Sequence, residues 1–352
     1  METLIDRFGE LALMCAVGVL VGLLFGGAAL QSRFCLRAAT VELAEGRPGP
    51  RIAVWLVAFC AALLAVQGAG LLGVLDTSGA RQLAATGSLS GAIIGGMMFG
   101  VGMILARGCV SRLLVLSATG NLRAIITGLV VTIVAQASLS GALAPAREAL
   151  ALLWTVPGGD GRSLLAVLNI RASLVAGTAA VVLLGALAFG IKQRVPVADL
   201  VAAALVGLAV FAGWYGTFAV AQASFEVVPV QSVTFTGPST DTLMALVSAP
   251  NLVAGFGLGL VAGVFCGALA GAVIRREARV QRFDADTPME RYLVGGVLMG
   301  FGSMLAGGCA VGAGMAGGSI MALTAWLAVF CMWIGAMVTH RLMSGAGAVG
   351  LA

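Results

Sequence analysis

The chain has 352 residues, of which 60% are apolar and only 10% charged, with a formal net charge of +5. Soluble domains carry about 25% charged residues, so there is too little polar surface here to coat a soluble particle. Apolar runs long enough to span a bilayer recur along the chain, and because they are continuous rather than alternating they predict helices and not barrel strands. The expected fold class is an all-α integral membrane protein.

The first half is predicted to contain five spans, at residues 11–30, 52–75, 91–107, 124–143 and 172–191. The N-terminus lacks the basic stretch and cleavage site of a signal peptide, so the first run is expected to be retained as a span. Segment 145–170 is interrupted by Pro145, Pro157 and glycines, and predicts a short interfacial or re-entrant helix.

The second half is predicted to contain four spans, at residues 198–220, 251–274, 291–306 and 319–340. Segment 221–250 resembles 145–170 in being broken and in containing a short apolar stretch. Lysine and arginine fall mostly in alternate loops, which places the N-terminus outside and the C-terminus in the cytoplasm. That distribution also explains the positive charge without nucleic acid as a partner. We expect one transmembrane transporter domain with two repeat halves, approximately 11–145 and 198–340.

Fifteen residues occur twice. Residues 95–109 and 295–309 share eight identical positions without a gap, and each copy ends in Gly-Cys. The first copy lies on the third predicted span and the second on the eighth, so the copies should cross the bilayer in opposite directions. This is the pattern of an inverted repeat, in which two pseudo-symmetric halves enclose a pathway. We therefore expect the two Gly-Cys turns to approach each other near the midplane.

The end of each copy carries the candidate chemistry. Gly108 and Gly308 are expected to end their helices in a left-handed cap, where free backbone N–H groups attract anions. Cys109 and Cys309 add a neutral, polarizable thiol, which is cheaper to bury than a charge and suits a soft anion. Arg107 and Arg112 stand beside Cys109, where they fit either membrane topology or an anion, and the second copy has Gly307 in place of Arg107. The two thiols should therefore experience different electric fields.

The remaining cysteines are interpreted differently. The chain has seven, an odd number, and most lie in apolar runs, which argues against a disulfide framework. Cys15, Cys60, Cys266 and Cys331 fit small core residues. Cys35 lies between Arg33 and Arg37, a setting that attracts anions, but the duplication does not support it. The residues alone leave its role open.

At these positions the chain resembles the YeeE/YedE family of sulfur-transport membrane proteins, which includes bacterial thiosulfate importers. The resemblance is carried by Ser32–Cys35, Gly100–Cys109 and Gly300–Cys309, and covers nearly the whole chain. It implies an hourglass-like protein of the bacterial inner membrane, in which Cys35, Cys109 and Cys309 mark the route. It also implies that thiosulfate passes by hydrogen bonding to thiols rather than by covalent transfer.

The expected function is uptake of thiosulfate or a related sulfur-containing anion by a permease or channel, without enzymatic activity, cofactor or metal. Arg33, Arg107, Gly108 and Gly308 are the candidate supporting residues. A cytoplasmic sulfur-accepting protein is a further expected partner, because no coupling site is evident. Two alternatives stay open. One is a membrane thiol oxidoreductase or persulfide carrier that uses Cys109 and Cys309. The other is a transporter for soft metal ions, which thiols bind well but nearby arginines repel.

Overall fold

Nine helices long and apolar enough to cross a membrane run through the described part of the chain, which in this computed structural model comprises residues 5, 7–248, 254–282 and 289–349. The predicted all-α membrane fold is therefore confirmed. The long helices are α2 (Glu10–Ser32), α4 (Pro50–Leu71), α6 (Leu89–Leu105), α8 (Leu122–Ser140), α11 (Ala172–Lys192), α12 (Val197–Ala223), α14 (Phe256–Ile274), α15 (Met289–Leu305) and α16 (Leu323–Val349).

Shorter elements fill the connections. They are α3 (Leu36–Ala44), α5 (Arg81–Ala84), α7 (Val110–Ala118), α9 (Ala144–Leu152), the 3-10 turn η1 (Gly159–Arg162), α10 (Leu164–Val167), α13 (Thr236–Ser248) and the π-helical segment η2 (Ala310–Gly317). Strands β1 (Gly87–Ser88) and β2 (Thr155–Val156) pair antiparallel. The expected short helix in 145–170 is α9. The first residues of the predicted span 251–274 and the last of segment 221–250 lie outside the described residues.

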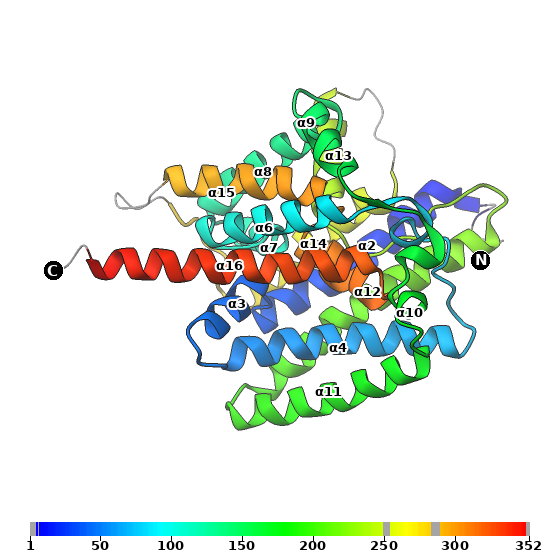
Figure 1. Ribbon diagram of the computed structural model, residues 1–352, viewed down its shortest axis with the longest axis horizontal. Coiled ribbons are helices and arrows are strands. Elements are labelled where there is room, and N and C mark those ends of the chain that lie inside the picture. Colours follow the sequence, from blue (N-terminus) through cyan, green and yellow to red (C-terminus); the bar gives the residue numbers. More distant parts are fainter. Residues whose placement is uncertain (1–4, 6, 249–253, 283–288, 350–352) are drawn as a thin grey trace.

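The helices pack through glycine, which lets backbones approach closely where the solvent is lipid. In Figure 1, α15 and α6 lie side by side next to α16, and α4 and α11 form the opposite edge of the bundle. The most extensive contact joins α2 and α14, where Gly18, Gly22 and Gly26 lie against the partner's backbone. Any side chain at these three positions would collide with α14.

The two copies of the repeat pack directly against each other. A Cβ atom at Gly95 would lie 2.5 Å from the carbonyl oxygen of Gly302, and one at Gly102 would lie 2.7 Å from that of Gly295. Moving seven residues forward along α6 therefore moves seven residues back along α15, so the two helices run antiparallel. The contact is also reciprocal, because residues 95 and 102 are the repeat equivalents of 295 and 302.

The next helices obey the same relation. Gly96 lies against Ala328 of α16, and its repeat equivalent Gly296 lies against Val130 of α8. Because α8 follows the first copy and α16 follows the second, each copy packs against the helix that follows the other copy. This exchange interlocks the two parts of the chain around the α6–α15 pair.

Candidate functional site

Three cysteines occupy turns of the same local structure. Each stands at the N-cap of a short helix: Cys35 before α3, Cys109 before α7 and Cys309 before η2. Two residues earlier the backbone is left-handed, with φ of 51° at Arg33, 54° at Arg107 and 80° at Gly307. The long helix therefore ends, the chain reverses within two residues, and a thiol begins the next helix.

The left-handed position is one residue earlier than the sequence suggested. Gly108 and Gly308 were expected to adopt it, but their N–H groups instead close Schellman-type bonds, to Met103 O at 3.1 Å and Ser303 O at 2.9 Å. Phe34 makes the equivalent bond to Ala29 O at 3.2 Å. The backbone N–H groups of Gly108 and Gly308 are thus already occupied in this conformation.

The available backbone donors lie just after each cysteine. The first three N–H groups of a helix have no partner within it and carry partial positive charge. In each turn the third of these faces the cysteine sulfur: Ala38 for Cys35, Arg112 for Cys109, and Gly312 for Cys309 at 3.5 Å. Each thiol therefore lies at the positive end of its own short helix, a setting that suits an anion.

The structure brings Cys35 and Cys109 together. Their thiols are neighbours, and the Cys109 sulfur also lies 3.3 Å from the Ser111 hydroxyl oxygen. Cys109 is 1% exposed and Cys35 is half-buried. The pair is formed by tertiary packing, because α2 contacts α7.

Two arginines act on this thiol pair. The charges of Arg37 and Arg112 both reach the Cys35 sulfur. Among the described residues, Arg37 Nε and Arg112 Nη1 are buried and have no hydrogen-bond partner. A buried donor left without a partner costs about 1–3 kcal/mol, and an anion held between the thiols and the guanidinium groups would supply the missing acceptors.

Cys309 has different surroundings. It is 1% exposed and is followed by a glycine-rich π-helical segment in which Gly312, Gly314 and Gly317 are buried. Thr234, in the extended chain before α13, places its hydroxyl directly against Gly312, the residue whose N–H faces the Cys309 sulfur. This end of the site therefore offers a thiol, a hydroxyl and backbone N–H groups.

The two Gly-Cys turns do not face each other, contrary to expectation. Because α6 and α15 are antiparallel, the Cys109 turn lies where α15 begins and the Cys309 turn lies where α6 begins. A Cβ atom at Gly91, near the start of α6, would lie 2.5 Å from Leu305 O, just before the Cys309 turn. The elements that meet between the turns are α7 and η2, which are in contact.

A basic cavity of about 260 Å³ lies beside the Cys309 turn. We call it the Arg162 pocket; its lining includes Arg81, Arg147, Arg162 and Gly307. Arg162 is 8% exposed and donates to Arg81 O, Ala85 O and the Thr324 hydroxyl. Burial, and then the charge of Arg81, lowers the pKa of Arg162. Arg147 forms a 3.1 Å salt bridge with Glu148, but no carboxylate of the described residues lines the pocket itself, so the charges of Arg81 and Arg162 are available to an anion.

Arg33 lies at the opposite end of the bundle, on a cavity of about 440 Å³ that it shares with Arg51, Arg194 and Arg275. This cavity also contains the Asp199 carboxylate, which accepts a 2.7 Å hydrogen bond from Gln31. Arg107 lines a different cavity at the same end. The two candidate arginines therefore do not share one site.

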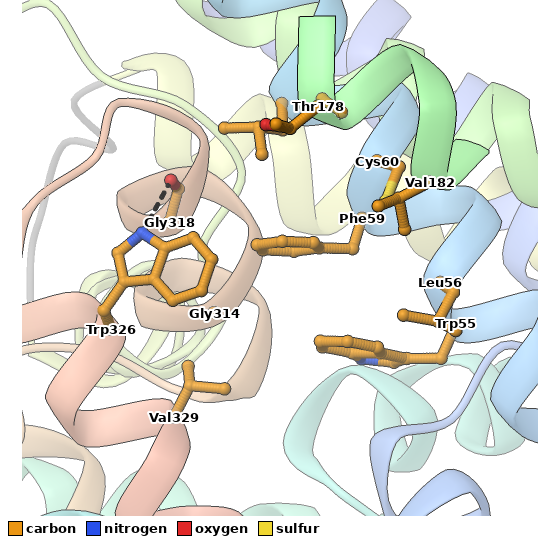
Figure 2. A pocket seen from close by; sticks show the side chains of 12 residues that line it. Trp55, Leu56, Phe59, Cys60, Thr178, Val182, Gly314, Gly318, Trp326 and Val329 are labelled. Atoms are coloured by element: carbon orange, nitrogen blue, oxygen red, sulfur yellow. Dashed lines mark hydrogen bonds between the residues drawn. The ribbon is translucent and has the colours of Figure 1, made fainter. Parts of the chain in front are cut away.

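An apolar pocket of about 340 Å³ lies between α4, α11, η2 and α16. Figure 2 shows Trp55 and Phe59 of α4 facing Gly314, Trp326 and Val329 across it. The Trp326 indole donates to Gly318 O at 3.2 Å, which anchors the end of η2. None of the described residues that line this pocket is charged. We therefore place the pocket outside the anion route.

Sequence reasoning singled out Arg112 together with Arg107 but missed two other residues of this site, Ser111 and Thr234. Ser111 lies in the first turn of the helix after Cys109, and that position could have indicated a donor facing the thiol. Thr234 had no such signal, because it reaches η2 from a segment about eighty residues away in the chain. The Arg-x-Cys pattern shared by Arg33–Cys35 and Arg107–Cys109 was a signal for the common turn.

Comparison with known proteins gives consistent similarities. The chain matches the sequence model described as "Sulphur transport" over residues 31–338. It is 25% identical to the thiosulfate transporter TsuA of Escherichia coli (strain K12) over 354 residues, covering 94% of this chain and 95% of that protein. It is 29% identical to the thiosulfate transporter TsuA of Spirochaeta thermophila over 340 residues, covering 90% and 94%.

Proposed function

Because this chain belongs to the sulphur transport family, we propose that it is a membrane permease for the uptake of thiosulfate or a related sulfur-containing anion. Two relatives that align over nearly their whole length are named thiosulfate transporters. The observation that carries the proposal is the thiol pair Cys35–Cys109 beneath unpaired nitrogens of Arg37 and Arg112. Positive charge, soft thiol donors and helix N-termini together suit a soft divalent anion.

The three cysteine turns act as successive weak sites. A neutral thiol donates one weak hydrogen bond, and the adjacent backbone N–H groups add others without a full charge. Conduction requires that each site bind strongly enough for the anion to enter and weakly enough for it to leave. The anion passes from the Cys309 turn, along the contact between η2 and α7, to the Cys35–Cys109 pair, and no covalent bond forms.

The orientation of the protein in the membrane is inferred from the basic loops. The N-terminus lies outside and the C-terminus in the cytoplasm of the bacterial inner membrane, so the Arg162 pocket opens outward and the Cys35–Cys109 pair lies toward the cytoplasm. The two halves, 11–145 and 198–340, are inverted repeats around the α6–α15 contact. A cytoplasmic sulfur-accepting protein keeps the anion moving inward by consuming it.

Uptake of radiolabelled thiosulfate into proteoliposomes tests this proposal. Cys109→Ala and Cys309→Ala should each abolish uptake while the purified protein retains wild-type thermal stability. Cys266→Ala is the matched control, because this exposed thiol lies outside the three turns. Unimpaired uptake by the Cys109 and Cys309 variants would refute the proposal.

One observation favours a second candidate, a thiol oxidoreductase or persulfide carrier. The thiols of Cys35 and Cys109 are neighbours, and two thiols must be adjacent to exchange electrons or sulfur. This pairing differs from the Cys109–Cys309 pair considered from sequence. Recovery of a Cys35–Cys109 disulfide during turnover, by mass spectrometry of the working protein, would favour this function. The soft-metal alternative is disfavoured because Arg37 and Arg112 would repel a cation.

A further inference from the structure

Another basic pocket, separate from the Arg162 pocket and from the cavity that contains Arg33, lies at the end of the bundle where α6 and α16 end. It has a volume of about 190 Å³, and we call it the His340 pocket. Its polar lining comes from different elements: Arg37 of α3, Arg107 of the turn after α6, Arg291 and Tyr292 of α15, and His340 of α16. No carboxylate from the described part of the chain lines it. Glu45 contacts the His340 ring at 3.1 Å but is not part of the lining.

The pocket contains polar groups that the protein itself leaves unsatisfied. Arg37 Nε is buried without a hydrogen-bond partner among the described residues. Tyr292 is 1% exposed, and its hydroxyl accepts a 3.0 Å hydrogen bond from Arg123, whose guanidinium carbon also lies 4.7 Å from the ring centroid. Among the described residues the Tyr292 hydroxyl has no acceptor, and Arg123 fixes the ring in place.

Arg37 joins this pocket to the thiol pair. Its charge interacts both with the Cys35 thiol and with Arg107. An anion that leaves Cys35 and Cys109 on this side therefore stays within the field of the same guanidinium as it reaches the pocket. The positive charge increases along this path, because Arg107 and Arg291 lie beyond Arg37.

The repeat relates this pocket to the one at the other end. The His340 pocket is lined by Ile104, Leu105 and Arg107, and the Arg162 pocket by their repeat equivalents Met304, Leu305 and Gly307. Each end of the antiparallel α6–α15 pair thus has a basic cavity beside a cysteine turn. The difference is the left-handed residue, which carries a guanidinium only at the His340 end.

We infer that the His340 pocket is a second anion site, which receives a small divalent oxyanion from the Cys35–Cys109 pair before release from the face where α16 ends. This inference rests on the proposed function and adds a site to its route. Free thiosulfate and the phosphate of a lipid headgroup share the required chemistry. The cavity is small, and Arg37 of its lining also interacts with the Cys35 thiol, which favours the free anion.

The test uses vesicles of both orientations, sorted by protease access to a tag at the C-terminus, with labelled thiosulfate as the probe. Arg107→Gly and Arg291→Gln should each raise the half-saturating thiosulfate concentration about tenfold from the His340 face, because each removes one charge-assisted hydrogen bond. From the Arg162 face the half-saturating concentration should change less than about twofold. Arg107→Gly should fold, because glycine occupies the equivalent left-handed position 307.

Lys192→Gln is the control, since this exposed lysine lies at the same end of the bundle but lines neither basic pocket there. An equal shift in Lys192→Gln would show a general surface-charge effect and overturn the inference. No shift in either pocket variant would also overturn it, as would a shift that requires phosphatidylglycerol and vanishes in phosphatidylcholine vesicles. These outcomes concern the pocket alone. If the pocket variants still transport thiosulfate and Cys109→Ala does not, the proposed function is still supported.

Discussion

The two ends of the α6–α15 pair share a backbone but differ in charge. Both end in a left-handed residue, a Schellman-type bond and a buried thiol at a helix N-terminus. At one end Cys109 is joined by Cys35, Arg37 and Arg112, whereas at the other Cys309 is surrounded by glycine backbone and the Thr234 hydroxyl. The comparison teaches that duplication conserves the position of the thiol, while neighbouring elements set how strongly each end holds an anion.

The largest effect should come from removing a thiol at the arginine-rich end. Cys35→Ala is expected to lower thiosulfate uptake by up to about 100-fold, as is Cys109→Ala, because both thiols and the two arginines form one site and a group left unpaired there costs about 1–3 kcal/mol. Proteoliposome uptake measures it, with Cys331→Ala as a control outside the three turns. Near-normal uptake in Cys35→Ala would show that Cys35 is not on the route. It would contradict the statement that Cys35 distinguishes the Cys109 end from the Cys309 end.

A smaller effect is expected from the charge that distinguishes the two ends. Arg112→Gln should raise the half-saturating concentration about 10- to 100-fold, because charge-assisted hydrogen bonds contribute about 1.5–3 kcal/mol. Arg112→Lys keeps the charge without the guanidinium geometry and should recover part of the loss. If the glutamine variant matches the wild type, Arg112 serves packing and the two ends do not differ as described.

The contact that relates the two ends can be tested by stability. Gly302→Ala places a Cβ atom 2.7 Å from Gly95 O and should destabilise the protein by about 1–3 kcal/mol through overpacking. Gly128→Ala in α8 is the matched control, because its Cβ atom would meet nothing within 4 Å. Thermal unfolding in detergent compares the two. Equal midpoints for both variants would contradict the close antiparallel packing of α6 and α15.

The smallest effect concerns the left-handed residue itself. Arg107 adopts a backbone conformation that costs a residue with a Cβ atom about 1 kcal/mol and costs glycine almost nothing. Arg107→Gly should therefore raise the unfolding midpoint by a few degrees or leave it unchanged, whereas Gly307→Arg should lower it. A lower midpoint for Arg107→Gly, together with an unchanged or higher midpoint for Gly307→Arg, would show that backbone strain does not distinguish the two turns.

Much of the fold could be predicted from the sequence. The apolar runs predicted nine spans, because a bilayer imposes a minimum length on each helix. Span parity predicted that the two repeat copies run in opposite directions, and the spacing of Gly95 and Gly102 against Gly302 and Gly295 agrees. The exact turn did not follow, since the left-handed residue is fixed by the Schellman-type bond of Gly108 rather than by where glycine occurs.

The site was less accessible to sequence reasoning. The repeat pointed to Cys109 and Cys309 as a facing pair, but antiparallel packing places their turns at opposite ends of α6. Cys35 lacks a repeat equivalent and joins Cys109 through the contact between α2 and α7, which no local pattern encodes. Thr234 likewise reaches Gly312 through tertiary packing alone. Residues whose role depends on a contact distant in sequence were therefore missed or left open.

Serine substitution at Cys109 tests most directly whether thiols pass the anion by hydrogen bonding. Serine keeps a hydroxyl donor at the same helix N-terminus but forms neither a disulfide nor a persulfide. Uptake of radiolabelled thiosulfate into proteoliposomes should be partly retained in Cys109→Ser and lost in Cys109→Ala. A serine variant as inactive as the alanine variant, with both folded, would contradict non-covalent passage and favour sulfur chemistry at the Cys35–Cys109 pair.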